Sequence, residues 1–138
     1  MKNGLILFAI LLGLQPINIS AQEHGTSSFF NPTSIGLLIY SNDSETLWNA
    51  LRFANFSKNA GDTVTIFLLG KGVELDILIK TNNDLEEQTD LFLGSGGKIL
   101  GCGTCLSSRN LNEPKICKFS SMEDLYVIIR KNKKIMTF

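Results

Sequence analysis

Two continuous apolar runs flank a segment of helical periodicity, and this pattern restricts the fold more than any other feature of the sequence. The first run covers residues 35–41 and the second covers residues 62–69, each bounded by polar turn residues. Strands that are apolar along their whole length are typical of a parallel sheet that is buried on both faces. Between the two runs, Leu47, Leu51 and Ala54 recur near helical spacing. The pattern predicts a strand–helix–strand unit with a right-handed crossover.

Helical and extended segments continue to alternate along the rest of the chain. The patterns predict helices at residues 73–79, 84–93 and 106–111, and strands at residues 116–119 and 134–138. Ser120 and Glu123 stand three residues apart, as in a capping box that opens a last helix. This alternation predicts the α/β class, in the form of a three-layer α/β/α sandwich around a parallel sheet.

The first residues differ in character from the remainder of the chain. Lys2 precedes an apolar run at residues 5–14, which is followed by small and polar residues. This order is typical of a secretory signal peptide, and we expect residues 1–21 to be that segment. A membrane anchor is the alternative, although the run is short for spanning a bilayer. Residues 22–34 are polar and predict a flexible arm before a single domain at residues 35–138, so we expect an exported protein of the periplasm.

The balance of charge argues against several classes of partner. The chain has 13 basic and 13 acidic residues, so we expect neither nucleic-acid binding nor a polybasic membrane surface. Once the signal peptide is cleaved, no stable membrane anchor is expected. The single histidine, His24, lies in the predicted arm, so we expect no metal site, no Ser/His/Asp triad and no cofactor.

A C-x-x-C motif is the strongest chemical signal in the sequence. Cys102 is predicted where a strand ends, and Cys105 is predicted in the first turn of the helix that follows. Unpaired backbone N–H groups at this helix start are expected to favour a thiolate at Cys102. Gly101 and Gly103 leave the backbone open beside Cys102, so that a partner sulfur can approach. The two cysteines form either a reversible disulfide or an inert pair, and Cys102 is either a nucleophile or a residue that fills space. Cys117 is expected to be structural, with a role in resolving a bond as the alternative.

Polar loops follow three of the predicted strands, at residues 41–44, 70–72 and 101–105. Because the carboxyl ends of parallel strands meet at one edge of a sheet, these loops should open together, where ligands bind in such folds. The loop at residues 70–72 either holds a small anion with its backbone or is a tight turn, and Arg109 either binds an anion or is an ordinary surface residue. The candidate substrate-binding residues are Asn42, Gly70, Lys71, Gly72, Gly101, Gly103, Thr104 and Arg109.

Several short motifs are spread over the chain from residue 35 to its end. They include Ala50-Leu51-Arg52-Phe53-Ala54, Gly70-Lys71-Gly72-Val73, and Cys102-Gly103-Thr104-Cys105-Leu106 followed by Arg109. With these motifs the chain resembles the DsrE/DsrF-like family of sulfur-relay proteins. The resemblance implies an α/β/α fold with a five-stranded, mostly parallel sheet and assembly into homo-trimers or hexamers. In the sulfurtransferase members one cysteine carries a persulfide, and by motif position that cysteine corresponds to Cys102 and a basic partner to Arg109.

Two functional hypotheses follow from the motif and the resemblance. The first is a sulfur-handling or thiol-redox protein of the cell envelope, a sulfurtransferase or sulfur carrier. In it Cys102 holds a sulfane sulfur and Cys105 releases it by forming a disulfide. Its partner would be a sulfur donor or acceptor protein or a small sulfur compound. The export signal and the additional Cys105 argue against cytoplasmic sulfur relay to tRNA. The alternative is a non-catalytic oligomeric module that binds a small ligand or a protein and has a structural cysteine pair.

Overall fold

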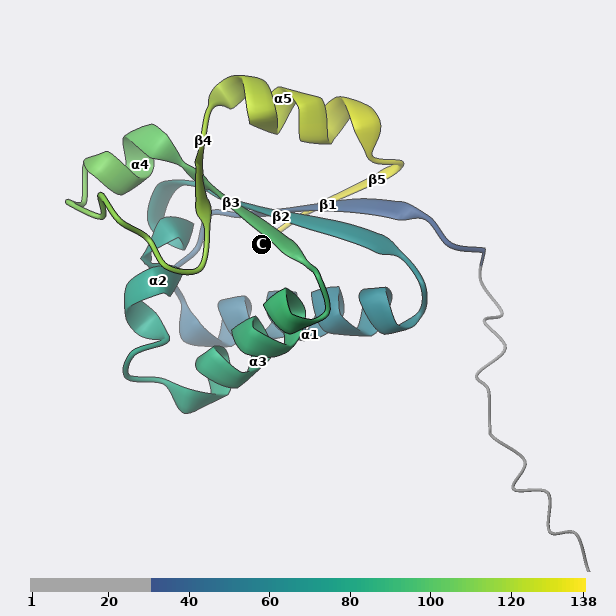
Figure 1. Ribbon diagram of the computed structural model, residues 1–138, viewed down its shortest axis with the longest axis horizontal. Helices are drawn as coiled ribbons and strands as arrows, with labels where there is room; N and C mark the ends of the chain where they lie inside the picture. Colours follow the sequence, from purple (N-terminus) through teal and green to yellow (C-terminus); the bar gives the residue numbers. More distant parts are fainter. Residues whose placement is uncertain (1–30) are drawn as a thin grey trace, which may run out of the picture.

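A parallel five-stranded sheet forms the middle layer of the computed structural model, which describes residues 31–138 (Figure 1). The strand order is β4-β3-β2-β1-β5, and every neighbouring pair is parallel. The strands are β1 (Ser34–Ile39), β2 (Thr63–Leu68), β3 (Lys98–Cys102), β4 (Lys118–Ser120) and β5 (Lys134–Thr137). The predicted α/β fold is therefore confirmed, whereas the predicted signal peptide lies outside the described residues.

Helices cover both faces of this sheet and complete the three layers. Helices α1 (Ser44–Asn59) and α3 (Asn83–Gly94) lie on one face, and α5 (Met122–Lys131) lies on the other (Figure 1). The chain moves from β1 to β4 in one direction across the sheet and then returns to the opposite edge at β5. Because parallel crossovers are right-handed, the returning helix α5 must lie on the opposite face.

Three short helices lie near the carboxyl ends of the central strands. The 3-10 helix η1 (Gly70–Glu74) and α2 (Leu75–Leu78) follow β2, and α4 (Gly103–Ser107) follows β3 directly. The prediction of a helix at residues 106–111 is wrong, because the helical turn begins immediately after Cys102 and has ended before Asn110, which adopts a φ of 57°.

Two other predicted boundaries also shift. The capping box of α5 uses Ser121 and Asp124, one residue later than predicted, because Ser120 is still paired in β4. The predicted arm ends earlier than residue 34: the backbone N–H of Thr33 donates to Asp62 Oδ1 at 2.7 Å, and β1 begins at Ser34. Both shifts come from pairing between segments that are distant in the sequence.

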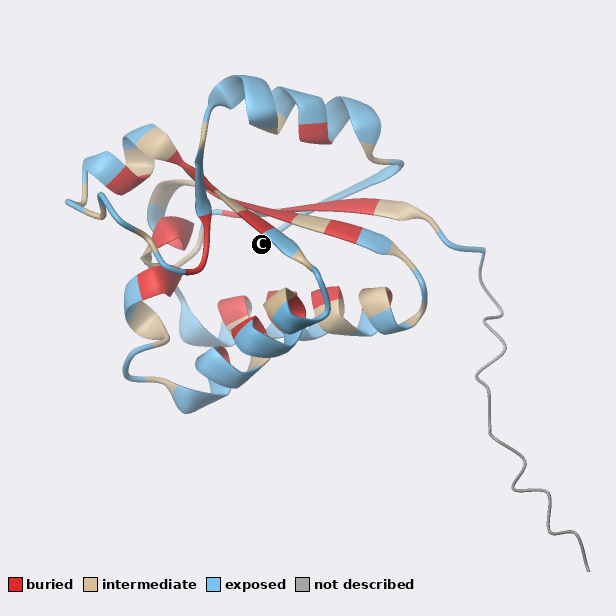
Figure 2. Cartoon of the chain, viewed as in Figure 1, coloured by how far each residue is buried: buried red, intermediate tan, exposed pale blue. Residues whose placement is uncertain are grey.

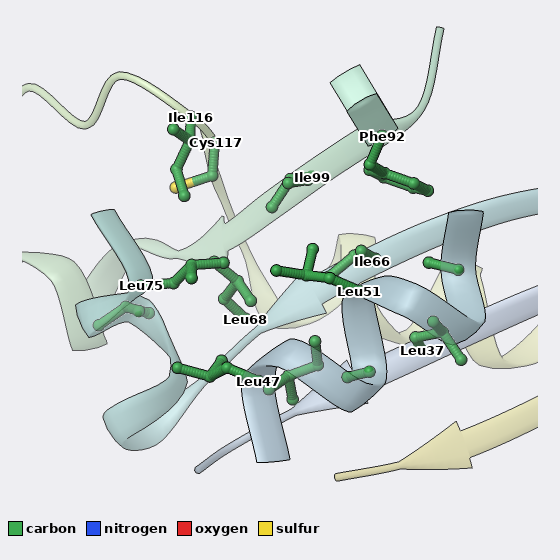
Figure 3. Packing of buried hydrophobic residues seen from close by; sticks show 14 of the residues in the cluster. Leu37, Leu47, Leu51, Ile66, Leu68, Leu75, Phe92, Ile99, Ile116 and Cys117 are labelled. Carbon is green, nitrogen blue, oxygen red and sulfur yellow. The ribbon is translucent and has the colours of Figure 1, made fainter. Parts of the chain in front are cut away.

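The apolar core is divided by the sheet into two clusters. The larger cluster lies between the sheet and α1 and α3, where Leu37, Ile66 and Leu68 of the strands meet Leu51 and Phe92 of the helices (Figure 3). Successive side chains of a strand point to opposite faces, so the smaller cluster forms around Phe67, Cys102 and Ile128 beneath α5. Figure 2 shows β1, β2 and β3 as the most continuously buried segments of the fold, whereas β5 is exposed along its whole length.

Cys117 belongs to the larger cluster, with 8% of its surface exposed (Figure 3). Its Sγ would lie 2.7 Å from a Cβ built at Gly101, so the sulfur rests against the backbone of β3. The buried carboxylate of Asp76 accepts hydrogen bonds from the N–H groups of Lys115 and Ile116, at 2.7 and 3.0 Å, which holds the segment before β4 in place. Burial, with a smaller effect from the charge of Asp76, raises the pKa of the Cys117 thiol to about 11. These contacts favour the structural role for Cys117.

The loop at residues 70–72 passes very close to β1, and this contact can be tested by substitution. A Cβ at Gly72 would lie 2.1 Å from the carbonyl oxygen of Ile39 and 2.8 Å from its carbonyl carbon. The carbonyl group of Ile39 cannot move aside without moving the backbone of β1. We therefore predict that Gly72→Ala lowers the free energy of unfolding by about 2–3 kcal/mol in denaturant titrations. Gly94→Ala is the matched control, since its Cβ would meet nothing within 4 Å. Equal stability of the two variants would contradict the close contact.

The raised pKa of Cys117 predicts a change of stability with pH. The thiol ionises in the unfolded chain near its ordinary pKa of 9.0 and in the folded chain at about 11. The folded state therefore retains the proton longer, and its stabilisation is complete below pH 9 and lost as the pH rises through 11. We expect the stability difference between wild type and Cys117→Ala to shrink by up to about 2 kcal/mol over this range. A difference that does not change with pH would contradict the assignment.

Candidate functional site

The loops that follow β1, β2 and β3 meet at the carboxyl edge of the sheet, as the sequence predicts. The register pairs Ile39 with Leu68 and Leu68 with Gly101, so the three strands end side by side. Hydrogen bonds join the loops. Asn42 Nδ2 donates to Glu74 Oε2 at 2.8 Å, and Arg109 Nε donates to Glu74 Oε1 at 2.8 Å. The candidate site is therefore a single connected set of residues.

Cys102 is the last residue of β3 and the residue that precedes α4. Only 4% of its surface is exposed, and it packs in the smaller cluster with Phe67 and Ile128. Burial raises the pKa of the Cys102 thiol, and its side-chain interaction with Cys105 raises it further, whereas the N–H groups of Cys105 and Thr104 act in the opposite direction. The expectation that the helix start favours a thiolate at Cys102 is wrong, because loss of solvation outweighs the N–H groups.

Cys105 lies in a different environment from Cys102. It is half-buried in the first turn of α4, and its Sγ accepts a hydrogen bond from the backbone N–H of Gly70 at 3.2 Å. Gly70 has a φ of 55°, a conformation that glycine adopts without strain. All three cysteines are free thiols in this structure. The N–H of Gly70 is therefore directed at a sulfur atom that reaches the surface.

Glu74 connects the site and was not identified from the sequence. Its carboxylate accepts from both Arg109 and Asn42, and these hydrogen bonds, that of Arg109 first, hold the pKa of Glu74 below its usual range. Arg109 Nη1 also donates to the carbonyl oxygen of Cys105 at 3.1 Å. Arg109 thus shares its charge with Glu74 and fixes the backbone of α4. The only sequence signal for Glu74 is its position two residues after the predicted turn at residues 70–72.

The glycines around the motif have packing roles that differ from the expectation. The space that a side chain at Gly101 would occupy is taken by Cys117 and Leu106, and Phe119 lies 3.2 Å from a Cβ built at Gly103. The view that these glycines open the backbone beside Cys102 to a partner sulfur is therefore wrong. They allow close packing within the domain instead.

The remaining predicted residues surround the thiols at the same edge. The N–H of Gly72 donates to the carbonyl oxygen of Leu69 at 3.0 Å, so it closes a turn. The side chains of Lys71 and Thr104 are exposed. Ligand binding by the predicted site residues stays a prediction.

Elsewhere on the surface of residues 31–138, open hollows lie over α1 and α3. One is lined by Asn55, Asn59, Glu87, Asp90, Leu91, Gly94 and Ser95, and the other by Ser44, Glu45, Trp48, Asn82, Asp84 and Leu85. Neither contains a residue of the candidate site.

Within residues 31–138, no helix has the length and apolar character needed to cross a membrane. The same part of the chain has no group of three or more His, Cys, Asp or Glu placed to hold a metal ion.

Comparisons with known proteins agree with this fold. The crystal structure of the ychN protein from E. coli superposes with a TM-score of 0.67 at 15% identity, covering 78% of this chain and 100% of that one. A conserved protein of unknown function from Bacteroides thetaiotaomicron superposes with a TM-score of 0.65 at 20% identity, covering 77% and 95%. No curated protein matches the sequence significantly. The profile of the DsrE/DsrF-like family matches residues 34–138, and the chain belongs to that family.

Proposed function

We propose that Cys102 and Cys105 form a thiol pair that handles sulfur, as a persulfide carrier or a reversible disulfide partner. The observation that carries this proposal is the contrast between the two thiols at the carboxyl edge of the sheet. Cys105 reaches the surface and receives the N–H of Gly70, whereas Cys102 is buried beside it. Membership of the DsrE/DsrF-like family supports sulfur chemistry, because the fold of this family is related to sulfur relay.

The arrangement suits thiol chemistry in physical terms. A sulfur anion is stabilised by a hydrogen bond to its charged form, which Gly70 N–H supplies at Cys105. Two cysteines in a C-x-x-C motif can exchange a persulfide for a disulfide without the approach of a third protein group. The partner we propose is a sulfur donor or acceptor protein or a small sulfur compound. The signal-peptide pattern of residues 1–21 supports a location in the cell envelope, where disulfides persist.

The proposal predicts that sulfur handling requires this pair and does not require the third cysteine. The reduced protein should react with glutathione persulfide, gaining one sulfur atom or releasing sulfide with formation of a Cys102–Cys105 disulfide. We expect the double variant Cys102→Ser/Cys105→Ser to lose both reactions and Cys117→Ser to retain them, measured by intact mass after thiol alkylation and by sulfide release. An unreactive wild type, or a double variant as active as wild type, would favour the alternative of a binding module with a structural cysteine pair.

We also propose that the chain self-associates through α5. Helix α5 is exposed over most of its length (Figure 2). Met122, Tyr126 and Ile129 recur at helical spacing on this helix and are 61%, 63% and 45% exposed. Ile135 of β5 is also part-exposed, at 37%, and its side chain lies with that of Ile128 against Gly36, on the face of the sheet that α5 covers (Figure 1). Contiguous exposed apolar surface of this kind marks interaction sites. A second copy of the chain is the occupant we propose, in keeping with the homo-trimer or hexamer that the family resemblance implies.

The self-association proposal is tested by a pair of matched substitutions. Tyr126→Asp places a charge in the apolar patch, and we expect it to shift the oligomer towards monomer in analytical ultracentrifugation. Phe56→Asp is the control, because Phe56 is 69% exposed on α1, on the opposite face of the sheet. A monomeric wild type, or an equal shift in both variants, would contradict an interface at α5.

A further inference from the structure

We propose that Cys105 receives sulfur from the external donor and that buried Cys102 is the resolving thiol. This division of roles is the reverse of the one suggested by motif position. It deepens the proposed function and rests on it. The substrate class it implies is a low-molecular-weight persulfide, whose outer sulfur can reach Cys105 at the surface and cannot reach Cys102 directly.

The first argument is the surroundings of Cys105. Its Sγ is the acceptor of the Gly70 N–H at 3.2 Å, and the side chain is half-buried. Its backbone is held by Arg109 Nη1, which donates to the Cys105 carbonyl oxygen at 3.1 Å, and Arg109 is held in turn by Glu74 at 2.8 Å. A fixed N–H donor lowers the cost of a sulfur anion at Cys105, and the fixed backbone keeps the sulfur in place for attack.

The second argument is the enclosure of Cys102. With 4% of its surface exposed, it has no room for an approaching donor, and Phe67 and Ile128 pack around it. The space beside Gly101 is filled by Cys117 and Leu106, so that face of β3 offers no alternative entry. Cys105 packs against both Cys102 and the larger cluster. A sulfur carried by Cys105 is therefore held beside Cys102.

The reaction then has two balanced steps. In the first, the Cys105 thiolate attacks the outer sulfur of the persulfide R–S–SH. A bond forms from Sγ to that sulfur, the R–S bond to it breaks, and R–S⁻ leaves with the electron pair. The proton that Cys105 loses on ionising goes to water, and R–S⁻ takes up a proton from water. In the second, Cys102 attacks Sγ of Cys105. The Cys102–Cys105 disulfide forms and HS⁻ leaves with the proton of Cys102.

The electron balance defines what the second step needs. The sulfane sulfur gains two electrons and becomes sulfide, and the two thiols lose them to become the disulfide. The reduced protein supplies these electrons for a single turnover, and a dithiol reductant is needed only to restore the thiols. One chain should therefore release one sulfide in the absence of added reductant.

Single variants in a Cys117→Ser background separate the two roles, because each has one remaining thiol and the added sulfur cannot migrate. The reduced proteins are mixed with glutathione persulfide and followed by intact mass and sulfide release. We expect Cys102→Ser to gain one sulfur atom at the rate of the first step and to release no sulfide. We expect Cys105→Ser to gain sulfur more slowly by about tenfold or more. Cys102→Ala and Cys105→Ala, with thermal unfolding curves for all four, show that the differences do not come from misfolding.

The opposite outcome would overturn the inference while leaving the proposed function intact. If Cys105→Ser gains sulfur as fast as the Cys117→Ser parent and Cys102→Ser does not, Cys102 is the receiving thiol. Uptake by the parent and by neither single variant would also overturn it, since attack would then require both thiols. If the parent and wild type gain no sulfur and release no sulfide, the proposed function fails together with the inference.

Discussion

The parallel register of β1, β2 and β3 is the constraint on which the rest of the structure depends. The strands are apolar on both faces, so a shift by one residue would move every side chain to the wrong cluster. With Ile39 opposite Leu68 and Leu68 opposite Gly101, the three following loops begin at one edge. The contact of Gly72 with the Ile39 carbonyl then leaves little freedom for η1, which presents Gly70 N–H to α4.

The surroundings of the two thiols differ because Cys102 is the last residue of β3, whereas Cys105 lies in α4. Cys102 still belongs to the sheet and is buried under α5, whereas Cys105 lies in the helical turn that emerges from it. Burial raises the pKa of the Cys102 thiol, and the backbone N–H of Gly70 donates a hydrogen bond to Cys105 Sγ. Glu74 stabilises this arrangement through Arg109, although a part-exposed ion pair contributes only a modest amount to folding, about 1 kcal/mol or less.

Local pattern was sufficient for the fold and for the edge of the sheet at which the loops of the candidate site meet. The apolar runs predicted β1 and β2, and parallel pairing predicted that the loops with Asn42, Gly70 and Cys102 would converge. The chemistry within the site depends on contacts between distant residues. Glu74 meets Arg109 across 35 positions, and the packing of Gly101 against Cys117 fills space that the sequence alone left open. The expectation of a thiolate at Cys102 was wrong for the same reason, because the spacing of a C-x-x-C motif does not show how deeply its cysteines are buried.

Intact mass of the protein purified from its native compartment, alkylated with and without prior reduction, tests the central claim most directly. The account predicts either one added sulfur atom on the Cys102 and Cys105 pair or a disulfide between them that mild reductant opens readily. Three freely alkylated cysteines with no added sulfur, or a bond that resists reductant, would contradict it.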